Sequence, residues 1–241
     1  MRWVYLSPHL DDAALSAGGW LYETVRAGDR VEIWTIVCGY PPPGELTPLA
    51  QFLHAQWGTA TVEQTVRLRR REDEKAASIL GARALHLDVP DCIYRRGPAG
   101  EALYGDIFVQ PHPLESDLPA RIASDISARL RPRDRVVCQF GIGGHVDHIL
   151  VRQAAERLDR PLWYTADLPY HFKQPGALEE QSAGMETFRI PLAEASLEAW
   201  IEAILAYRSQ LSTVFDDADR IEPDIRGFYA AWGGFPLWRS H

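Results

Sequence analysis

Short apolar runs alternate along this chain with longer segments that have helical periodicity. The short runs predict strands, and the longer segments repeat their apolar residues at the spacing of a helix. This alternation is typical of βαβ units, in which crossover helices join consecutive parallel strands. The sequence therefore predicts an α/β fold with a mostly parallel sheet flanked by helices. The predicted strands are Trp3–Leu6, Val31–Val37, Ala84–Leu87, Arg135–Phe140, Pro161–Tyr164 and, with a weaker pattern, Thr187–Pro191.

Residues that terminate helices follow the first two predicted helices. Asp12–Ala27 is followed by Gly28, and Thr61–Leu80 is followed by Gly81. The other predicted helices are Ser116–Leu130, Val146–Leu158 and Ala193–Ser209. A chain of 241 residues is long enough for one domain of this kind with a full core. We therefore expect residues 1–241 to form a single Rossmann-like α/β domain.

Composition excludes several classes of partner. The formal net charge of −8 argues against a nucleic acid or an anionic membrane, because both favour basic surfaces. The three cysteines are an odd number and lack C-x-x-C spacing, so neither a disulfide framework nor a thiolate zinc site is expected. No stretch approaches the roughly 18 apolar residues of a membrane helix, and the N-terminus lacks the pattern of a signal peptide. A cytoplasmic protein is the expectation.

A cluster of metal-ligating residue types, His9, Asp11 and Asp12, directly follows the first predicted strand. The carboxyl ends of strands are where open α/β sheets bind their ligands. His9 and Asp12 can bind one divalent cation from a tight turn, which leaves Asp11 beside the metal, where its carboxylate can accept a proton from water. The same aspartates also suit an ordinary helix start, with Asp11 or Asp12 as N-cap.

A second cluster lies in the segment G-I-G-G-H-V-D-H, between the fourth predicted strand and the helix after it. Helical spacing places His148 on the side that should pack on the sheet, where a polar residue needs a partner. Asp147 can hold one imidazole in a fixed tautomer. Two other interpretations are a capped helix start with a hydrogen-bonded histidine and, with a poor match in glycine spacing, a phosphate-binding turn.

The coincidence of the two clusters favours a metal site. Each cluster lies at a strand-to-helix turn of one parallel-sheet domain, so both are expected at the same edge of the sheet. The metal site should therefore lie at that edge. Two histidines and one carboxylate leave an open coordination position, as in catalytic rather than structural zinc sites.

The two motifs in combination resemble the PIG-L/LmbE family of metal-dependent N-acetylglucosaminyl deacetylases. They are P-H-L-D-D-A-A-L-S-A-G-G at Pro8–Gly19 and G-H-V-D-H at Gly144–His148. The likeness continues through Arg69–Glu72, where the family has an R-x-x-E helix that ends in Leu-Gly, through Val89–Asp91, and through Tyr207–Gln210, which resembles a Y-x-S-Q stretch. One departure is Val146, where many relatives have proline.

The resemblance implies a role for each residue of the two clusters. It implies zinc ligation by His9, Asp12 and His148, with iron as an alternative because a His-His-Asp set suits either metal. It implies Asp11 as the general base, and His145 as the group that steadies the oxyanion or assists the leaving amine. The implied reaction is hydrolysis of an N-acyl amide, in the simplest case the acetamide of an amino sugar or a related small conjugate. The alternatives are a metal hydrolase of a phosphoester or cyclic amide, and a non-catalytic metal-containing binding protein.

The resemblance also implies three contacts with the substrate, from Arg69, Asp91 and Gln210. Helical periodicity turns Arg69 toward the apolar side of its helix, where a structural salt bridge with Asp73 or Glu72 is the alternative. Asp91 can equally be a turn residue, and Gln210 can equally cap a helix.

Two long connections, 39–58 and 90–115, follow strands and should lie at the same end of the sheet as the two clusters. Loops of this length serve as lids, binding loops or subunit contacts, so a homo-oligomer is among the interpretations that the sequence leaves open. A plain surface insertion is the alternative. Substrate specificity should reside in these loops, although aromatic loop residues such as Trp57 more often pack the loop onto the core than bind a sugar.

Overall fold

A seven-stranded sheet forms the centre of the structure, a computed structural model that describes residues 1–240 and, at Pro175, the backbone alone. The strand order is β3-β2-β1-β4-β5-β7-β6. Strands β1 to β5 are parallel, and β7 runs antiparallel to both of its neighbours. The strands are β1 (Arg2–Ser7), β2 (Arg30–Gly39), β3 (Arg83–Pro90), β4 (Arg135–Gln139), β5 (Leu162–Thr165), β6 (Glu186–Ile190) and β7 (Phe235–Arg239).

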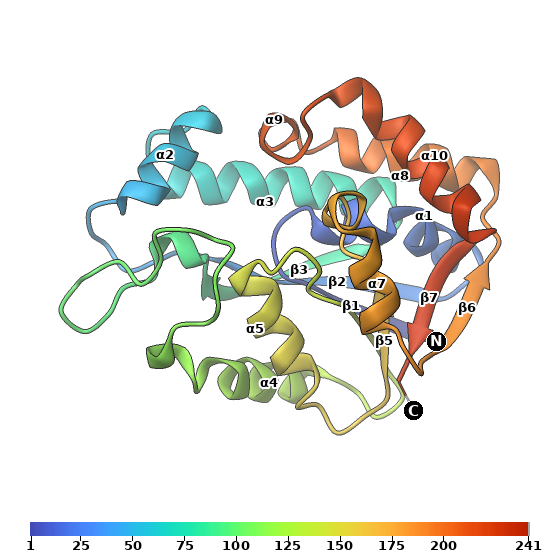
Figure 1. Cartoon of the computed structure of the whole chain (residues 1–241), viewed down its shortest axis with the longest axis horizontal. Helices are drawn as coiled ribbons and strands as arrows, with labels where there is room; N and C mark the ends of the chain where they lie inside the picture. The colour runs from blue at the N-terminus through green and yellow to red at the C-terminus, as the bar shows by residue number, and fades with distance from the viewer. Residues whose placement is uncertain (241) are drawn as a thin grey trace.

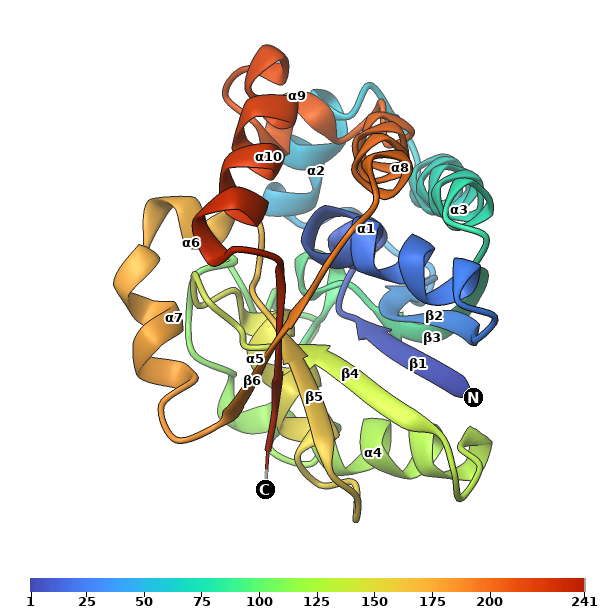
Figure 2. The same cartoon turned by 90° about the vertical axis from the view of Figure 1, so that its right-hand side faces the viewer.

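Helices cover both faces of the sheet (Figure 1; Figure 2). On one face lie α1 (Asp12–Arg26), α3 (Val62–Ile79) and α8 (Glu194–Leu205), and on the other lie α4 (Leu118–Arg129) and α5 (Val146–Ala155). None of the helices in residues 1–240 is long and apolar enough to cross a membrane. The remaining helices are α2 (Pro48–Gln56), α6 (Tyr170–Lys173), α7 (Pro175–Gln181), α9 (Leu211–Val214), α10 (Ile221–Trp232), η1 (Cys92–Tyr94), η2 (Pro113–Glu115) and η3 (Ala218–Arg220).

The predicted mostly parallel α/β fold is confirmed, and all six predicted strands form. Strand β7 was not predicted, because Pro236 within it argues against a central strand. The strand is nevertheless possible because only Trp238 and Arg239 pair with β5, so Pro236 lies outside that pairing. The predicted helix Ala193–Ser209 was too long at both ends: α8 begins at Glu194 and ends at Leu205.

Two consecutive glycines allow α1 to pack closely against α8. A Cβ atom at Gly18 would lie 2.6 Å from Trp200 Cδ1, and one at Gly19 would lie 2.8 Å from Trp200 Cε3. Trp200 is fully buried, and its Nε1 donates a hydrogen bond to the carbonyl oxygen of Ala14 at 2.7 Å. The Gly-Gly pair therefore positions α1, the helix that begins at the first cluster of site residues.

Replacement of Gly18 by alanine is expected to lower the free energy of unfolding by about 1–3 kcal/mol, because the added methyl group overpacks the Trp200 contact. Gly227→Ala is the matched control in α10, where nothing lies within 4 Å of the added atom. That change should stabilise the protein by about 0.5–1 kcal/mol, since glycine is costly inside a helix. Urea denaturation measures the free energy of unfolding of both variants. Equal changes in that free energy would contradict the packing argument.

Candidate metal centre

The two clusters of His and Asp residues meet at the carboxyl ends of β1 and β4, which are adjacent parallel strands. The turn after β1 carries His9, and the turn after β4 leads into α5, which carries His148. Their ring centroids are 5.4 Å apart, and that of His145 lies 4.6 Å from His9. The predicted meeting of the two motifs at one edge of the sheet is confirmed.

One carboxylate oxygen lies between two histidines. Asp12 Oδ2 is 3.4 Å from His9 Nδ1 and 3.3 Å from His148 Nε2. The opposite nitrogen of each ring faces a different carboxylate: His9 Nε2 lies 3.0 Å from Asp147 Oδ2, and His148 Nδ1 lies 3.0 Å from Asp167 Oδ1. Carboxylates in this position typically orient the histidines that ligate a metal.

The two separations from Asp12 Oδ2 are compatible with a bound metal ion. Nitrogen and oxygen atoms bound at about 2.0–2.1 Å to a tetrahedral ion lie about 3.3–3.4 Å apart. The two separations from Asp12 Oδ2, 3.4 and 3.3 Å, match that value. Ring nitrogens of His9, His145 and His148 also lie within 4.8 Å of one another. These buried residues are candidate ligands for a divalent metal ion.

Asp11 has an unusual backbone conformation. Its φ of 144° and ψ of −35° are rare for a residue with a side chain and cost roughly 1–3 kcal/mol. Asp11 occupies the N-cap position of α1, but its side chain makes no capping hydrogen bond within the described chain. The Asp12 carboxylate accepts instead from the backbone N–H of His9 at 2.8 Å. The predicted N-cap position of Asp11 is therefore confirmed, although its side chain makes no capping hydrogen bond in the described chain, and Asp11 lies beside the cluster of His and Asp residues.

Burial and the Asp12 carboxylate raise the pKa of Asp11 to about 7, while Arg69 and His9 oppose the shift. Arg69 Nη2 lies 3.7 Å from Asp11 Oδ2. A cation bound at Asp12 would act in the same direction as Arg69 and favour the ionised carboxylate. Asp11 therefore lies beside the cluster, and a cation there would favour the ionised form that accepts a proton.

His145 is the N-cap residue of α5. Its Nδ1 accepts a hydrogen bond from the backbone N–H of Asp147 at 3.1 Å. Burial and the neighbouring His9 and His148 lower the pKa of His145 well below its usual range. A neutral ring whose Nδ1 is an acceptor carries its hydrogen on Nε2, so His145 can serve as an N–H donor in the site.

Two buried carboxylates support the histidines from behind. Asp147 was predicted to hold an imidazole, and the ring that it contacts is that of His9, in the turn after the neighbouring strand β1. Asp167 was not predicted. It follows β5, the next parallel strand, and also accepts from the backbone N–H of Gly141 at 3.0 Å. Its signal in the sequence is the Thr-Ala-Asp step after the fifth predicted strand, at the same edge of the sheet.

Arg69 reaches the site from α3. Its Nη1 lies 3.8 Å from Asp91 Oδ2, and its Nε has no hydrogen-bond partner among residues 1–240. The alternative salt bridge with Asp73 or Glu72 does not form. Asp73 accepts instead from the hydroxyl of Tyr207 and faces His86, and Glu72 accepts from Ser209.

Asp91 and Gln210 also lie at the site. Asp91 Oδ1 accepts from the backbone N–H of Ile93 at 3.2 Å, so the turn interpretation is confirmed, while Oδ2 lies 3.9 Å from His9 Nε2. Gln210 occupies a helix cap position, the N-cap of α9, rather than the end of the helix predicted before it, and its side chain makes no capping bond in the described part of the chain. Its buried amide nitrogen donates to Ser209 Oγ at 2.8 Å.

A cavity of about 140 Å³ opens beside the cluster. The loop 39–58 contributes Trp57, whose ring lies 4.8 Å from the Arg69 guanidinium carbon. Tyr170 is a second aromatic residue in its wall, and Gly143 lets it approach, because a Cβ atom at Gly143 would lie 2.7 Å from its ring. Neither aromatic residue was predicted as part of the site. The cavity is lined by His9, Asp11, Asp12, Leu15, Leu53, Trp57, Arg69, Asp91, Ile93, Ile107, His145, His148, Leu168, Pro169, Tyr170, Gln210, Thr213 and Val214.

Comparisons with known proteins agree with this geometry. The sequence model of the PIG-L family, described as GlcNAc-PI de-N-acetylase, matches residues 4–158. A 2'-N-acetylparomamine deacetylase from Niallia circulans is 27% identical over 237 residues, which cover 89% of this chain and 82% of that protein.

Solved structures of deacetylases share the whole fold. A deacetylase–bog complex from the teicoplanin biosynthesis pathway superposes with a TM-score of 0.83 at 27% identity, covering 99% of this chain and 97% of that one. The zinc-inhibited form of teicoplanin deacetylase superposes with a TM-score of 0.82 at 26% identity, covering 99% of this chain and 97% of that one. The deacetylase of the A40926 pseudoaglycone superposes with a TM-score of 0.73 at 29% identity, covering 98% of this chain and 96% of that one. With both motifs at one metal-binding edge of the sheet, and with more than half of its length matched by the family model, this chain belongs to the PIG-L family.

Proposed function

We propose that this protein is a metal-dependent N-deacetylase that hydrolyses the N-acetyl amide of an amino sugar or a related small conjugate. The observation that carries the proposal is the closeness of His9 Nδ1 and His148 Nε2 to Asp12 Oδ2, with Asp11 in the wall of the same cavity. Membership of the family and relatives that are deacetylases support an amide as the bond that is cleaved. Residues 1–241 would act as one catalytic domain.

His9, Asp12 and His148 would hold the ion, and zinc is the proposed metal because three nitrogen and oxygen ligands with an open position are typical of catalytic zinc. A divalent cation in such a site polarises a carbonyl oxygen and acidifies water. Measurement of the metal content of the purified protein separates zinc from iron, which also suits two histidines and a carboxylate.

The side chains of this protein would move the protons. Asp11 accepts a proton from the attacking water as the water oxygen bonds to the acyl carbon. The Nε2–H group of His145 donates a hydrogen bond to the carbonyl oxygen as negative charge develops there. The C–N bond then breaks, and the departing amine takes its proton from Asp11 or from His145. Acetate and the free amino sugar are the products.

The cavity suits the reacting end of a small substrate. Its volume of about 140 Å³ is below the roughly 300–1,000 Å³ of pockets that enclose a whole drug-sized ligand. We propose that it holds the acetamido group and the sugar carbons nearest to it, with Arg69, Asp91 and Gln210 as polar contacts. The rest of the conjugate would lie outside, against the loops 39–58 and 90–115.

The proposals for location and assembly are those made from the sequence. We propose a cytoplasmic location, supported by three buried free cysteines, which are typical of a reducing compartment. Neither a nucleic acid nor a membrane is proposed as a partner. Size-exclusion chromatography with light scattering would test for a homo-oligomer.

A substrate panel tests the proposed function. Metal-loaded and chelator-treated protein is incubated with N-acetylglucosamine, its glycosides, a phosphoester and a cyclic amide. We expect acetate and free amine in equal amounts, from N-acetyl sugars alone and only with metal. Phosphate release or ring opening would indicate one of the other hydrolases. A protein that binds metal but turns over no compound of the panel would indicate the non-catalytic alternative.

Arg69→Met is expected to lower kcat/KM by about 10–100-fold, the scale of a lost hydrogen bond to a charged group. The reason is that the guanidinium is buried beside the cavity with one nitrogen unpartnered within residues 1–240. Arg70→Met is the matched control, because Arg70 binds the carbonyl oxygen of Cys38 at 2.9 Å and the exposed Asp88. Steady-state kinetics of both variants decide: equal kcat/KM values would remove Arg69 from substrate binding.

A further inference from the structure

A buried arginine reaches the carboxylate that holds His9. Arg95 Nη1 lies 2.6 Å from Asp147 Oδ1, and Asp147 Oδ2 lies 3.0 Å from His9 Nε2. Asp147 Oδ2 also accepts from the backbone N–H of Cys92 at 3.0 Å. Asp147 is fully buried, and each of its oxygens has a protein partner: Oδ1 forms an ion pair with Arg95, and Oδ2 contacts His9 and Cys92.

Arg95 is itself held from the opposite side. Its Nε lies 2.6 Å from Glu115 Oε1, and the hydroxyl of Tyr104 donates to Glu115 Oε2 at 2.5 Å. Both Arg95 and Glu115 are buried. The guanidinium therefore lies between two buried carboxylates, and a continuous set of contacts runs from Tyr104 through Glu115, Arg95 and Asp147 to the ring of His9.

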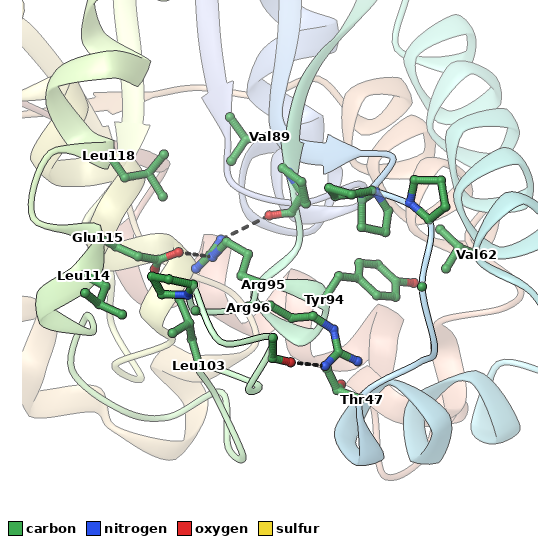
Figure 3. Close-up of a pocket in the computed structure, with 18 of the residues that line it drawn as sticks. Thr47, Val62, Val89, Tyr94, Arg95, Arg96, Leu103, Leu114, Glu115 and Leu118 are labelled. Carbon is green, nitrogen blue, oxygen red and sulfur yellow. Dashed lines mark hydrogen bonds and ion pairs between the residues drawn. The ribbon is translucent and has the colours of Figure 1, made fainter.

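This arginine also forms part of the wall of a second cavity. The cavity, of about 750 Å³, lies between the loops 39–58 and 90–115, and Arg95 lines it together with Tyr94 and Glu115 (Figure 3). Figure 3 shows the guanidinium bridging from Glu115 to the carbonyl oxygen of Pro90, which it binds at 3.1 Å. Arg95 therefore connects the side of the protein that carries this cavity to Asp147, which in turn contacts His9.

Removal of the guanidinium would leave Asp147 without a cation. A buried carboxylate that loses its partner is strongly unfavourable, and the group rearranges to recover solvent or another donor. The larger cavity offers that solvent on the side of Arg95. Asp147 would then turn away from His9, and the ring would lose the contact that sets which nitrogen faces Asp12.

We propose that Arg95 is a positioning residue for the metal centre: by fixing Asp147 it sets the ring orientation and the tautomer of His9. Carboxylates behind ligating histidines contribute about 10–100-fold to metal affinity. The inference rests on the proposed role of His9 as a metal ligand. It gives the loop 90–115 a part in metal binding in addition to its expected part in specificity.

Metal affinity tests this proposal without reference to catalysis. The Zn²⁺ dissociation constant is measured by chelator competition, and the visible spectrum of Co²⁺-loaded protein reports the ligand geometry. In Arg95→Met we expect the dissociation constant to rise by about 10–100-fold and the cobalt bands to shift. Arg95→Lys should fall between Arg95→Met and the unmodified protein, since an ammonium group keeps the charge but cannot bind both carboxylates with the geometry of the guanidinium.

Arg96→Met is the matched control. Within residues 1–240 its guanidinium binds the backbone carbonyl oxygens of Gly100 and, at 2.6 Å, Glu45, so the substitution should leave affinity and spectrum unchanged. Arg95 variants that fold and match this control in both readouts would overturn the proposal. Should Arg95→Met fail to fold, Arg95→Lys decides by the same comparison. His9→Ala tests separately whether His9 is a metal ligand. Undiminished Zn²⁺ affinity in that variant would show that His9 is not a ligand, and the proposal for Arg95 would then fail as well.

Discussion

Asp11→Asn is expected to lower kcat by about 100-fold or more while the fold and the metal content stay unchanged. The amide has the shape of the carboxylate but cannot accept a proton from water. Asparagine also has the same branching at Cβ and Cγ as aspartate, so the backbone conformation at φ 144° should persist. Steady-state kinetics, metal content per chain and thermal unfolding of the variant measure the three parts of this expectation.

The neighbouring aspartate provides the control. Asp12→Asn should lose metal as well as activity, because Asp12 Oδ2 is the atom that both histidines face. The two adjacent substitutions are therefore expected to separate proton transfer from metal binding. Near-normal turnover in Asp11→Asn would remove Asp11 from the role of general base, and a loss of metal there would reassign it as a ligand.

His148→Ala is expected to lose the metal, and activity with it. The imidazole is buried, and its Nε2 faces Asp12 while its Nδ1 is held by Asp167 at 3.0 Å, so no other side chain can replace it without rearrangement. Metal affinity should fall by more than the roughly 10–100-fold expected for Asp167→Asn, which only loosens the ring. Elemental analysis after dialysis, and titration of the apoprotein with Zn²⁺, measure the order of these effects.

His171→Ala serves as the matched control for His148→Ala. This histidine lies on α6, four residues beyond Asp167, but does not line the cavity beside the cluster. Its substitution should leave metal affinity unchanged. Undiminished zinc in His148→Ala, or an equal loss in His171→Ala, would overturn the proposed ligand set.

The sequence predicted the parts of the fold that depend on local pattern. Short apolar runs located the five parallel strands, and strand-to-helix turns located both clusters, because a turn after a parallel strand must lie at one edge of the sheet. Strand β7 was not predicted because its sequence contains Pro236, and because its pairing with β5 depends on tertiary structure. Helix α2 escaped because it lies within a loop that begins with a run of prolines.

The partners of the site residues could not be predicted in the same way. Asp147 contacts His9 only because β1 and β4 are neighbours in the sheet, and sequence spacing does not give strand order. Asp167 depends in addition on β5 lying next to β4. Arg69 has an inward direction that periodicity predicts, but its contacts with Asp11 and Asp91 depend on how α3 packs against two separate turns.

A single-turnover reaction in H₂¹⁸O tests the central claim most directly. If Asp11 activates water that attacks the acetyl carbonyl at a site held by His9, Asp12 and His148, the acetate from the first turnover carries one solvent oxygen and the amino sugar carries none. Chelation and Asp11→Asn should each suppress the labelled acetate. Unlabelled acetate from the first turnover, or labelled acetate formed equally fast by chelated protein, would contradict the account.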